Sequence, residues 1–280
     1  MHVADPVHLR SWHAELALHY RHRGGRTVLA ERRHDGPLVV QKPLYPEGDA
    51  VCHTIILHPP AGIVGGDELE ISCDAAVDAQ VLLTTPGAGK WYRSAGPWAK
   101  QRLSFDVAAG ACLEWLPQET IVFDGALADM KSRINLANGA SYIGWEILCL
   151  GRAGSGERYE HGTCRLHTQI RRDGKLLWFE KGNIEAGGRI GAAAAGLGGH
   201  SVCATMIAAG NIDAALLAQC RAQTADDAGI AMTLLPGPLL VARHLGDSGA
   251  TVRHHFERLR ACLRPALTGR AAVEPRIWRT

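Results

Sequence analysis

The sequence TTPGAGKWYRS at residues 84–94 decides between two fold classes, because its Gly-Ala-Gly-Lys follows an apolar run as a phosphate-binding loop would. A working phosphate loop reads G-x-x-x-x-G-K-[ST] and opens a helix, so that backbone N–H groups surround the phosphates and the hydroxyl binds magnesium. With Gly89-Lys90 as the GK pair, the first glycine position holds Thr84 and the hydroxyl position holds Trp91. A Ser-Ala-Gly-Pro sequence then ends any helix within about one turn. The stretch therefore argues against a nucleotide-binding α/β protein.

Strand patterns extend from this stretch in both directions. Residues 12–20, WHAELALHY, alternate apolar with polar side chains, which is typical of a half-buried strand. Similar short segments, separated by turns that contain Gly, Pro or Asp-Gly, are 27–29, 38–40, 51–57, 69–71, 81–85, 101–107, 111–116, 131–136, 142–150, 164–171 and 176–181. Short strands at such spacing indicate a mainly β architecture.

Helical patterns are few and late in the chain. The segment 212–223 is rich in Ala, Leu and Gln at helical spacing. The segment 248–267 is the stronger candidate, because Ser248 can cap it and four apolar residues form one stripe. Pro265 is expected to bend or end this helix, and Gly269 lies just beyond it. The sequence therefore predicts a single mainly β domain, residues 1–280, with two helices in its C-terminal third.

Composition narrows the function classes. The chain has 280 residues, of which 46% are hydrophobic and 21% charged, so it can bury a full core. A net charge of +2 is too small to favour a nucleic-acid partner. No apolar run reaches the roughly 18 residues of a membrane span. The N-terminal MHVADPVHLRSWHAE is too polar for a signal peptide, and the eight cysteines contain no CxxC pair. We therefore expect a cytoplasmic protein with reduced, mostly buried thiols.

Histidine and cysteine spacing offers only weak metal motifs. His161-x2-Cys164-x2-His167 resembles a metal triplet, but on a strand Cys164 would point away from the two histidines. A structural role is the preferred interpretation. The pair His254-His255 is expected to be solvated on the polar side of the last helix. The sequence also contains no G-x-S-x-G nucleophile motif.

Several carboxylates follow glycine or lie inside apolar strands, where an unpaired charge is costly unless it binds a cation. Most of the six carboxylates suited to acid–base chemistry fit this description, and the six are Asp67, Glu119, Asp124, Glu146, Glu180 and Glu185. Glu180 lies in LLWFEK at 176–181, and the competing interpretation is an ion pair with a nearby Lys or Arg. Asp67 ends the loop LHPPAGIVGGD at 57–67, whose prolines and glycines require a specified path. We expect Asp67 to point inward, and the alternative is a carboxylate that accepts backbone N–H bonds within a turn.

Six long segments resemble the UreD family of urease accessory proteins, also called UreH in some bacteria. They are LHPPAGIVGGDELE (57–70), LLTTPGAGKWYRS (82–94), LEWLPQETIVFDGA (113–126), GWEILCLGRAGSGE (144–157), LPGPLLVARHLGD (235–247) and LRPALTGRAAVEPRIW (263–278). The resemblance implies a helix-like stack of β-strands with two α-helices. It also implies a non-enzymatic maturation factor that binds the urease apoprotein, the helical accessory protein UreF and the GTPase accessory protein UreG.

The resemblance further implies that nickel(II) passes through such a complex to urease, with no tightly bound cofactor. Ni²⁺ accepts imidazole, carboxylate and carbonyl ligands, and a route needs separated weak ligands rather than a closed site. Asp67, Glu146 and Glu180 are therefore predicted to line a nickel conduit. Arg276 and Trp278 are predicted to contact the helical partner, although Trp278 could equally pack on its own domain. Two other functions stay open, namely a small hydrolase with a His/carboxylate pair and a scaffold without nickel contact.

Overall fold

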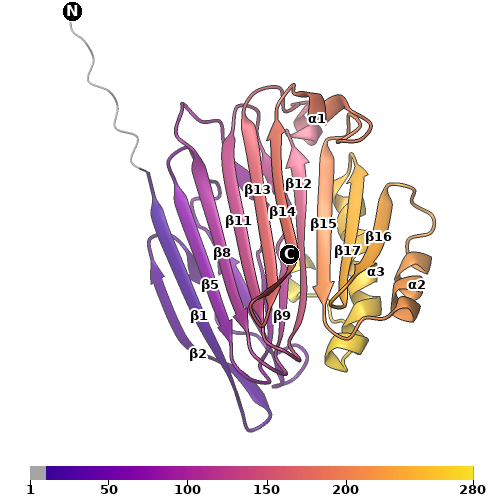
Figure 1. Ribbon diagram of the computed structural model, residues 1–280. Coiled ribbons are helices and arrows are strands. Elements are labelled where there is room, and N and C mark those ends of the chain that lie inside the picture. Colours follow the sequence, from indigo (N-terminus) through magenta and orange to yellow (C-terminus); the bar gives the residue numbers. More distant parts are fainter. Residues whose placement is uncertain (1–10, 280) are drawn as a thin grey trace, which may run out of the picture.

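Two β-sheets packed face to face form most of the molecule (Figure 1). The computed structural model describes residues 11–279. Residues 1–10, which include most of the segment considered above for a signal peptide, and residue 280 lie outside the described part.

The first sheet contains, in spatial order, β14 (Lys175–Glu185), β13 (Thr163–Arg172), β11 (Leu127–Leu136), β8 (Ala99–Val107), β5 (Glu68–Ala75), β1 (His13–Arg23) and β2 (Arg26–Asp35). The second contains β16 (Ile230–Leu235), β17 (Leu239–Gly246), β15 (Val202–Ala209), β12 (Ser141–Leu150), β9 (Cys112–Leu116), β6 (Gln80–Thr84), β4 (Val51–Leu57) and β3 (Val39–Val40). β10 (Thr120–Val122) pairs with β12 and with β7 (Gly89–Trp91). We call these the seven-stranded and the ten-stranded sheet.

The chain alternates between the two sheets through its first half. β4, β6, β9 and β12 run parallel in the ten-stranded sheet, while β5, β8, β11 and β13 run parallel in the seven-stranded sheet. Each turn of the chain therefore adds one strand to each sheet. This arrangement confirms the helix-like stack of β-strands.

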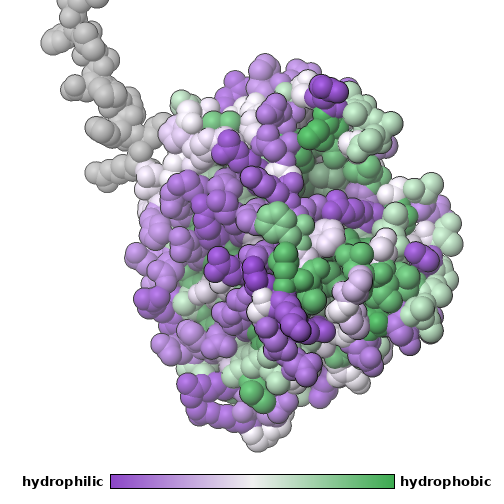
Figure 2. Space-filling view, viewed as in Figure 1, coloured by the Kyte–Doolittle hydropathy of each residue, from purple (hydrophilic) through white to green (hydrophobic). Residues whose placement is uncertain are grey.

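Alternating side chains from both sheets fill the core between them. In β1, Leu16, Leu18 and Tyr20 are each about 1% exposed, as the alternation at 12–20 predicts. The buried Tyr20 hydroxyl donates to Thr54 Oγ1 of β4 at 2.6 Å, which joins the two sheets. The outer face of the seven-stranded sheet is rich in charged residues, and Figure 2 shows hydrophilic side chains over most of it. Beside it, over β14 to β17, the same view shows an apolar patch. β14 carries the exposed apolar side chains Leu176 and Phe179.

Helices cover the other face of the ten-stranded sheet. Within residues 11–279, α2 (Ala214–Ala222) and α3 (Gly249–Thr268) lie on this face, whereas the short α1 (Arg189–Ala192) lies beside β14. The 3₁₀ helices of the same region are η1 (Ala153–Ser155) and η2 (Arg276–Arg279). Within α3 the predicted stripe Val252, Phe256, Leu259 and Leu263 is fully buried. Among residues 11–279, no helix combines the length and the apolar composition that crossing a membrane requires.

The ends of α3 agree with the sequence, and of the two outcomes expected for Pro265, a bend or an end, the end is excluded. The Ser248 hydroxyl accepts from the Thr251 N–H at the start, and Gly269 closes the helix at φ 69° with its N–H on the Pro265 carbonyl. Pro265 does not end the helix, which continues to Thr268. The sequence pattern also missed β7, β10, β15, β16, β17 and α1.

A buried ion network fastens α3 to the ten-stranded sheet. Glu114 of β9 accepts from Arg260 Nε at 2.6 Å and from Arg264 Nε at 2.8 Å. Arg264 also binds Glu47, with Nη1 2.7 Å from Oε2, and Glu47 in turn binds His53 Nε2 at 2.6 Å. All five side chains are at most 5% exposed, so each charge depends on its partners.

Candidate functional site

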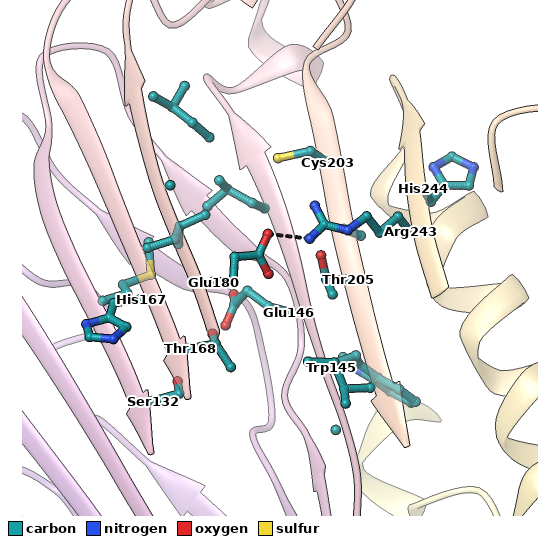
Figure 3. Close-up of a pocket in the computed structure, with 18 of the residues that line it drawn as sticks. Ser132, Trp145, Glu146, His167, Thr168, Glu180, Cys203, Thr205, Arg243 and His244 are labelled. Atoms are coloured by element: carbon teal, nitrogen blue, oxygen red, sulfur yellow. Dashed lines mark hydrogen bonds and ion pairs between the residues drawn. The ribbon is translucent and has the colours of Figure 1, made fainter. Parts of the chain in front are cut away.

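A cavity of about 470 Å³ lies between the two sheets near the β14 edge. We call it the inter-sheet cavity. Apolar side chains such as Met130 and Ile207 form much of its wall, and polar side chains project from both sheets. The polar lining includes Gln101, Ser132, Glu146, Thr168, Glu180, Thr205 and Arg243. Figure 3 shows Glu146, Glu180, Thr205 and Arg243 directed into this common space.

Glu146 is the carboxylate with the fewest partners here. It lies on β12, where successive residues alternate between the cavity and α3, so the buried Trp145 beside it packs against Phe256 instead. Its Oε1 accepts from the Thr120 hydroxyl. Burial raises the pKa of Glu146 to about 7, and the Thr120 hydrogen bond only partly offsets this rise. The side chain keeps some accessible surface because it borders a cavity, although protein surrounds it. Near neutral pH it can therefore release a proton and accept a cation.

Glu180 of β14 enters the same cavity but has a cationic partner. Arg243 Nη2 of β17 lies 2.5 Å from Glu180 Oε1, and the pair crosses from one sheet to the other. The Arg243 guanidinium also lies 5.7 Å from the centre of the Trp178 ring. The ion pair that the sequence left open for Glu180 is thus present. The structure brings Glu146 and Glu180 into one cavity, but their role toward nickel stays a prediction.

A second cavity, of about 330 Å³, adjoins the first. The two share Gln101, Trp115 and Glu146 as lining residues, so Glu146 borders both. The loop 85–91 and His58 line the second cavity. Burial lowers the pKa of His58, and Asp67 opposes this shift.

Asp67 is buried but lines neither cavity. Its Oδ2 accepts from the Val64 N–H at 2.9 Å and its Oδ1 from the Trp12 N–H at 2.8 Å. The Val64 bond is the turn geometry that the sequence left as the alternative for this residue, whereas the Trp12 bond ties the turn to the segment before β1. Gly65 permits it, because a Cβ there would lie 2.2 Å from Ser94 Oγ. The inward position of Asp67 is confirmed, and its proposed role toward nickel is untested.

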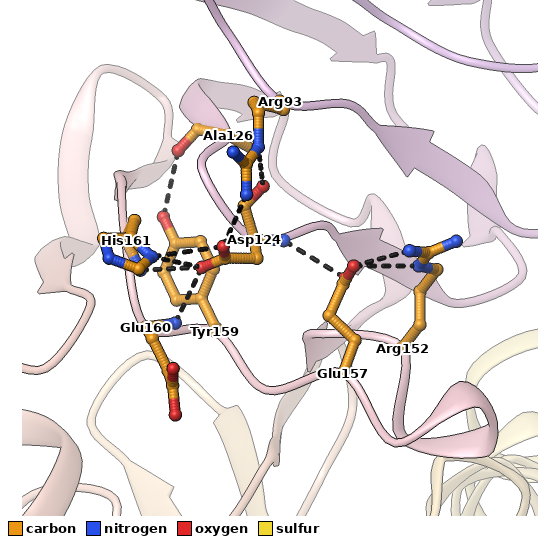
Figure 4. Close-up of polar contacts among 8 residues, drawn as sticks. All are labelled: Arg93, Asp124, Ala126, Arg152, Glu157, Tyr159, Glu160 and His161. Atoms are coloured by element: carbon orange, nitrogen blue, oxygen red, sulfur yellow. Dashed lines mark hydrogen bonds and ion pairs between the residues drawn. The ribbon is translucent and has the colours of Figure 1, made fainter.

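His161, Cys164 and His167, whose spacing resembles a metal triplet, have separate structural roles. His161 precedes β13, and its Nδ1 lies 3.1 Å from Asp124 Oδ2, while Asp124 Oδ1 accepts from the His161 N–H at 2.7 Å (Figure 4). Cys164 is fully buried in the core, and the His167 ring packs edge-on against Phe179. Asp124 therefore organises the loop before β13, as the preferred structural interpretation expects.

Cysteine chemistry agrees with the expectation of reduced thiols. All eight cysteines are free, and five of them are buried. Cys203 lines the inter-sheet cavity, and burial raises the pKa of its thiol to about 12. It is therefore a protonated thiol near neutral pH, which makes it a poor nucleophile for a hydrolase.

The expectation for the His254-His255 pair is wrong for one of its members. His254 is exposed, but His255 is only 6% exposed and its Nδ1 lies 3.1 Å from Asp227 Oδ2. His255 follows Val252 by three residues and precedes Leu259 by four, so it lies beside the buried stripe. That spacing is the sequence signal that could have predicted the burial of His255. The pattern gave no sign of its neighbours Asp227 and His244, which belong to other segments.

The C-terminal tail folds back onto the domain. Trp278 Nε1 donates to Thr84 Oγ1 at 2.8 Å, and its ring lies 5.9 Å from that of Trp145. This is the packing alternative that the sequence left open for Trp278. Arg276 is exposed. Contact of these two residues with a protein partner stays a prediction.

Comparison with known proteins assigns the chain to a family. The family model described as UreD urease accessory protein matches residues 13–279. A protein named urease accessory protein UreD from Azoarcus sp. (strain BH72) is 53% identical, covering 100% of this chain and 97% of its own length. Proteins of the same name from Dechloromonas aromatica (strain RCB), 51% identical over 99% and 98%, and Pseudomonas aeruginosa PAO1, 48% identical over 96% of each chain, are also similar. The chain therefore belongs to the UreD family of urease accessory proteins.

Proposed function

We propose that this chain is a non-enzymatic, cytoplasmic factor of urease maturation that passes Ni²⁺ through the space between its two sheets. In this proposal it binds the urease apoprotein and receives nickel in a complex with UreF and UreG. Membership of the UreD family supports the link to urease. The observation that carries the nickel role is Glu146, a carboxylate that borders two adjoining cavities.

The chemistry of Glu146 suits transient rather than permanent binding. Its pKa near 7 means that a proton competes with a cation for the carboxylate under physiological conditions. A carboxylate with one hydroxyl neighbour is a weak site for a transition-metal ion, which prefers several N, O or S ligands. A cation bound there would exchange rather than remain.

Glu180 adds a second step in this proposal. Its carboxylate is held by Arg243, so a cation that enters the inter-sheet cavity must displace or share that ion pair. Arg243 is 51% exposed and can swing toward solvent without leaving a buried charge unpaired. The ion pair would then open when nickel arrives. Asp67 lines neither cavity, but its charge acts on His58, which lines the second cavity. In this proposal Asp67 would act on nickel there through its charge, while backbone N–H groups hold it in place.

The test is co-expression of this chain with urease and its other accessory proteins, reading nickel per urease active site. Glu146→Gln keeps the side-chain shape and removes the charge, so we expect urease nickel content to fall several-fold. Copurification with urease should persist, because the residue is internal. The matched control is Glu70→Gln on the outer face of the seven-stranded sheet. Full nickel content in Glu146→Gln, Glu180→Gln and Asp67→Asn alike would contradict the conduit.

A further inference from the structure

Asp227, His244 and His255 form a compact cluster on the helix-covered side of the ten-stranded sheet. Asp227 lies in the segment between α2 and β16, His244 in β17 and His255 in α3. One ligand atom from each lies within 4.8 Å of the other two. Three separate segments thus place two imidazoles and one carboxylate around one point.

Hydrogen bonding leaves this cluster incompletely satisfied. Asp227 Oδ1 accepts from the Gly229 N–H at 2.6 Å, and Oδ2 pairs with His244 Nε2 at 3.0 Å. His255 Nδ1 lies 3.1 Å from the same Oδ2, but its geometry is not that of a hydrogen bond. This nitrogen is buried and has no hydrogen-bond partner among the described residues. A buried polar atom without a partner is uncommon and calls for a bound ion or water.

We propose that Asp227, His244 and His255 bind one divalent transition-metal ion that prefers imidazole, such as Ni²⁺, Zn²⁺ or Co²⁺. The spacing from the carboxylate to each imidazole fits, because ligands at right angles on bonds of about 2.0–2.1 Å are separated by about 3 Å. The distances from Asp227 Oδ2 to the two imidazole nitrogens are 3.0 and 3.1 Å. Two nitrogens and one oxygen favour these metals over Mg²⁺ or Ca²⁺, which prefer oxygen ligands.

The protonation of the cluster agrees with metal binding. Burial lowers the pKa of His255, although Asp227 opposes the shift, so the neutral imidazole dominates near neutral pH. Burial would raise the pKa of Asp227, but the Gly229 N–H and His244 outweigh it and the pKa falls. Asp226 and Arg258 also act on His255 and carry opposite charges. The cluster therefore offers a carboxylate and at least one neutral imidazole.

Access and location distinguish this site from the proposed nickel route. Asp227 is 23% exposed while the two histidines are at most 8% exposed, so the cluster is open on the loop side and closed toward the sheet. Glu146 belongs to the opposite face of the ten-stranded sheet, and His244, although it is among the residues that line the inter-sheet cavity, turns its ring away from Glu146 and Glu180 (Figure 3). Three ligands hold an ion more firmly than an isolated carboxylate. The bound ion would join α3, β17 and the segment before β16, whether or not nickel crosses the inter-sheet cavity.

The experiment uses the full chain, freed of metal with a chelator and titrated with Co²⁺, whose visible d–d absorption reports coordination. The wild type should bind one equivalent saturably at this site, and Zn²⁺ should displace it. His255→Gln should weaken binding by at least about 100-fold, since even loss of the groups behind metal ligands costs about 10–100-fold. His254→Gln, which changes the exposed neighbour, should retain the band.

An identical Co²⁺ titration of the wild type and His255→Gln, or no band in the wild type, would overturn the proposal and leave a metal-free hydrogen-bonded cluster. If His255→Gln fails to fold, Asp227→Asn replaces it, since Asn keeps the shape and removes the charge. Zn²⁺ should raise the melting temperature of the wild type, because a ligand of the folded state stabilises it, and should raise that of Asp227→Asn much less. Equal rises in both would also overturn the site. Loss of the band together with normal nickel delivery to urease would separate this site from the proposed conduit.

Discussion

Buried carboxylates on the two faces of the ten-stranded sheet differ in the number and charge of their hydrogen-bond partners. Glu114 and Glu146 lie on the paired strands β9 and β12, but their side chains point to opposite faces. On the helix side, Glu114 receives two guanidinium groups from α3. On the cavity side, Glu146 has the Thr120 hydroxyl.

The pKa values show the consequence of this difference. Glu47 belongs to the buried ion network that fastens α3 to the sheet, which we call the helix-side network. Burial would raise the pKa of Glu47, but hydrogen bonds from His53 and Arg264 lower it below the ordinary value. Burial dominates for Glu146 and raises its pKa to about 7. A fully paired buried carboxylate is fixed in the fold, whereas a sparsely paired one keeps its capacity for a proton or a cation. The first arrangement is structural and the second is available for function.

The largest effect should come from breaking the helix-side network. Arg264→Met keeps the apolar stem but leaves Glu114 and Glu47 short of a positive charge. We expect a loss of about 3–5 kcal/mol in the free energy of unfolding, measured by urea titration at pH 7.

Its control is Arg33→Met, which removes an exposed ion pair to Glu15 with an N–O distance of 2.5 Å. That change should cost less than about 1 kcal/mol, because solvent screens the pair. Equal losses in the two variants would show that burial does not distinguish them.

A smaller effect of opposite sign is expected on the cavity side. The folded-state pKa of Glu146 is raised from 4.5 to about 7, so the folded protein holds this proton more tightly than the unfolded chain. The wild type therefore loses stability as pH rises from about 4.5 through 7, and Gln does not. Glu146→Gln should stabilise the protein by about 3 kcal/mol at pH 8 and change little at pH 4.5.

Melting curves at the two pH values measure this difference, and the shift at pH 8 should be about 5 °C for a chain of this size. Glu70→Gln on the exposed face is the matched control and should show no such pH dependence. A Glu146→Gln protein that is destabilised at pH 8 would mean that the carboxylate has a compensating partner.

The smallest effect concerns the tail. Trp278→Phe removes the hydrogen bond to Thr84 and keeps an aromatic ring beside Trp145. We expect a loss of about 1 kcal/mol in unfolding free energy. Arg276→Ala should leave stability unchanged because Arg276 is exposed. Pull-down with UreF then tests the partner prediction, and normal binding by both variants would refute it.

Alternation in the sequence predicted the strands whose two faces differ in polarity. β1 has a core face and a solvent face, and its pattern is clear. β15 lies between the inter-sheet core and the helices, so VCATMIAA has no polar face and its pattern is ambiguous. The same reason applies to β17, whose apolar residues divide between two cores.

Individual site residues could be named from sequence, but their partners could not. Glu146 and Glu180 stood out as acids within apolar strands, and both reach the inter-sheet cavity. Arg243 follows Glu180 by 63 residues, and only the pairing of sheets brings them together. His255 could have been placed by its spacing from Leu259, whereas Asp227 and His244 depend on tertiary structure.

The helix-side network also constrains the order in which the chain can mature on the ribosome. Arg264 follows Glu114 by 150 residues and Glu47 by 217, so the acids are synthesised long before their cation. Until α3 emerges, the ten-stranded sheet has an uncovered apolar face and two carboxylates without guanidinium partners. Because a nascent chain folds from its N-terminus, the stacked strands form first, and their apolar face stays exposed until α3 is synthesised. Chains that stop before residue 249 should therefore be insoluble and should be recovered with chaperones, even though they contain every strand of both sheets.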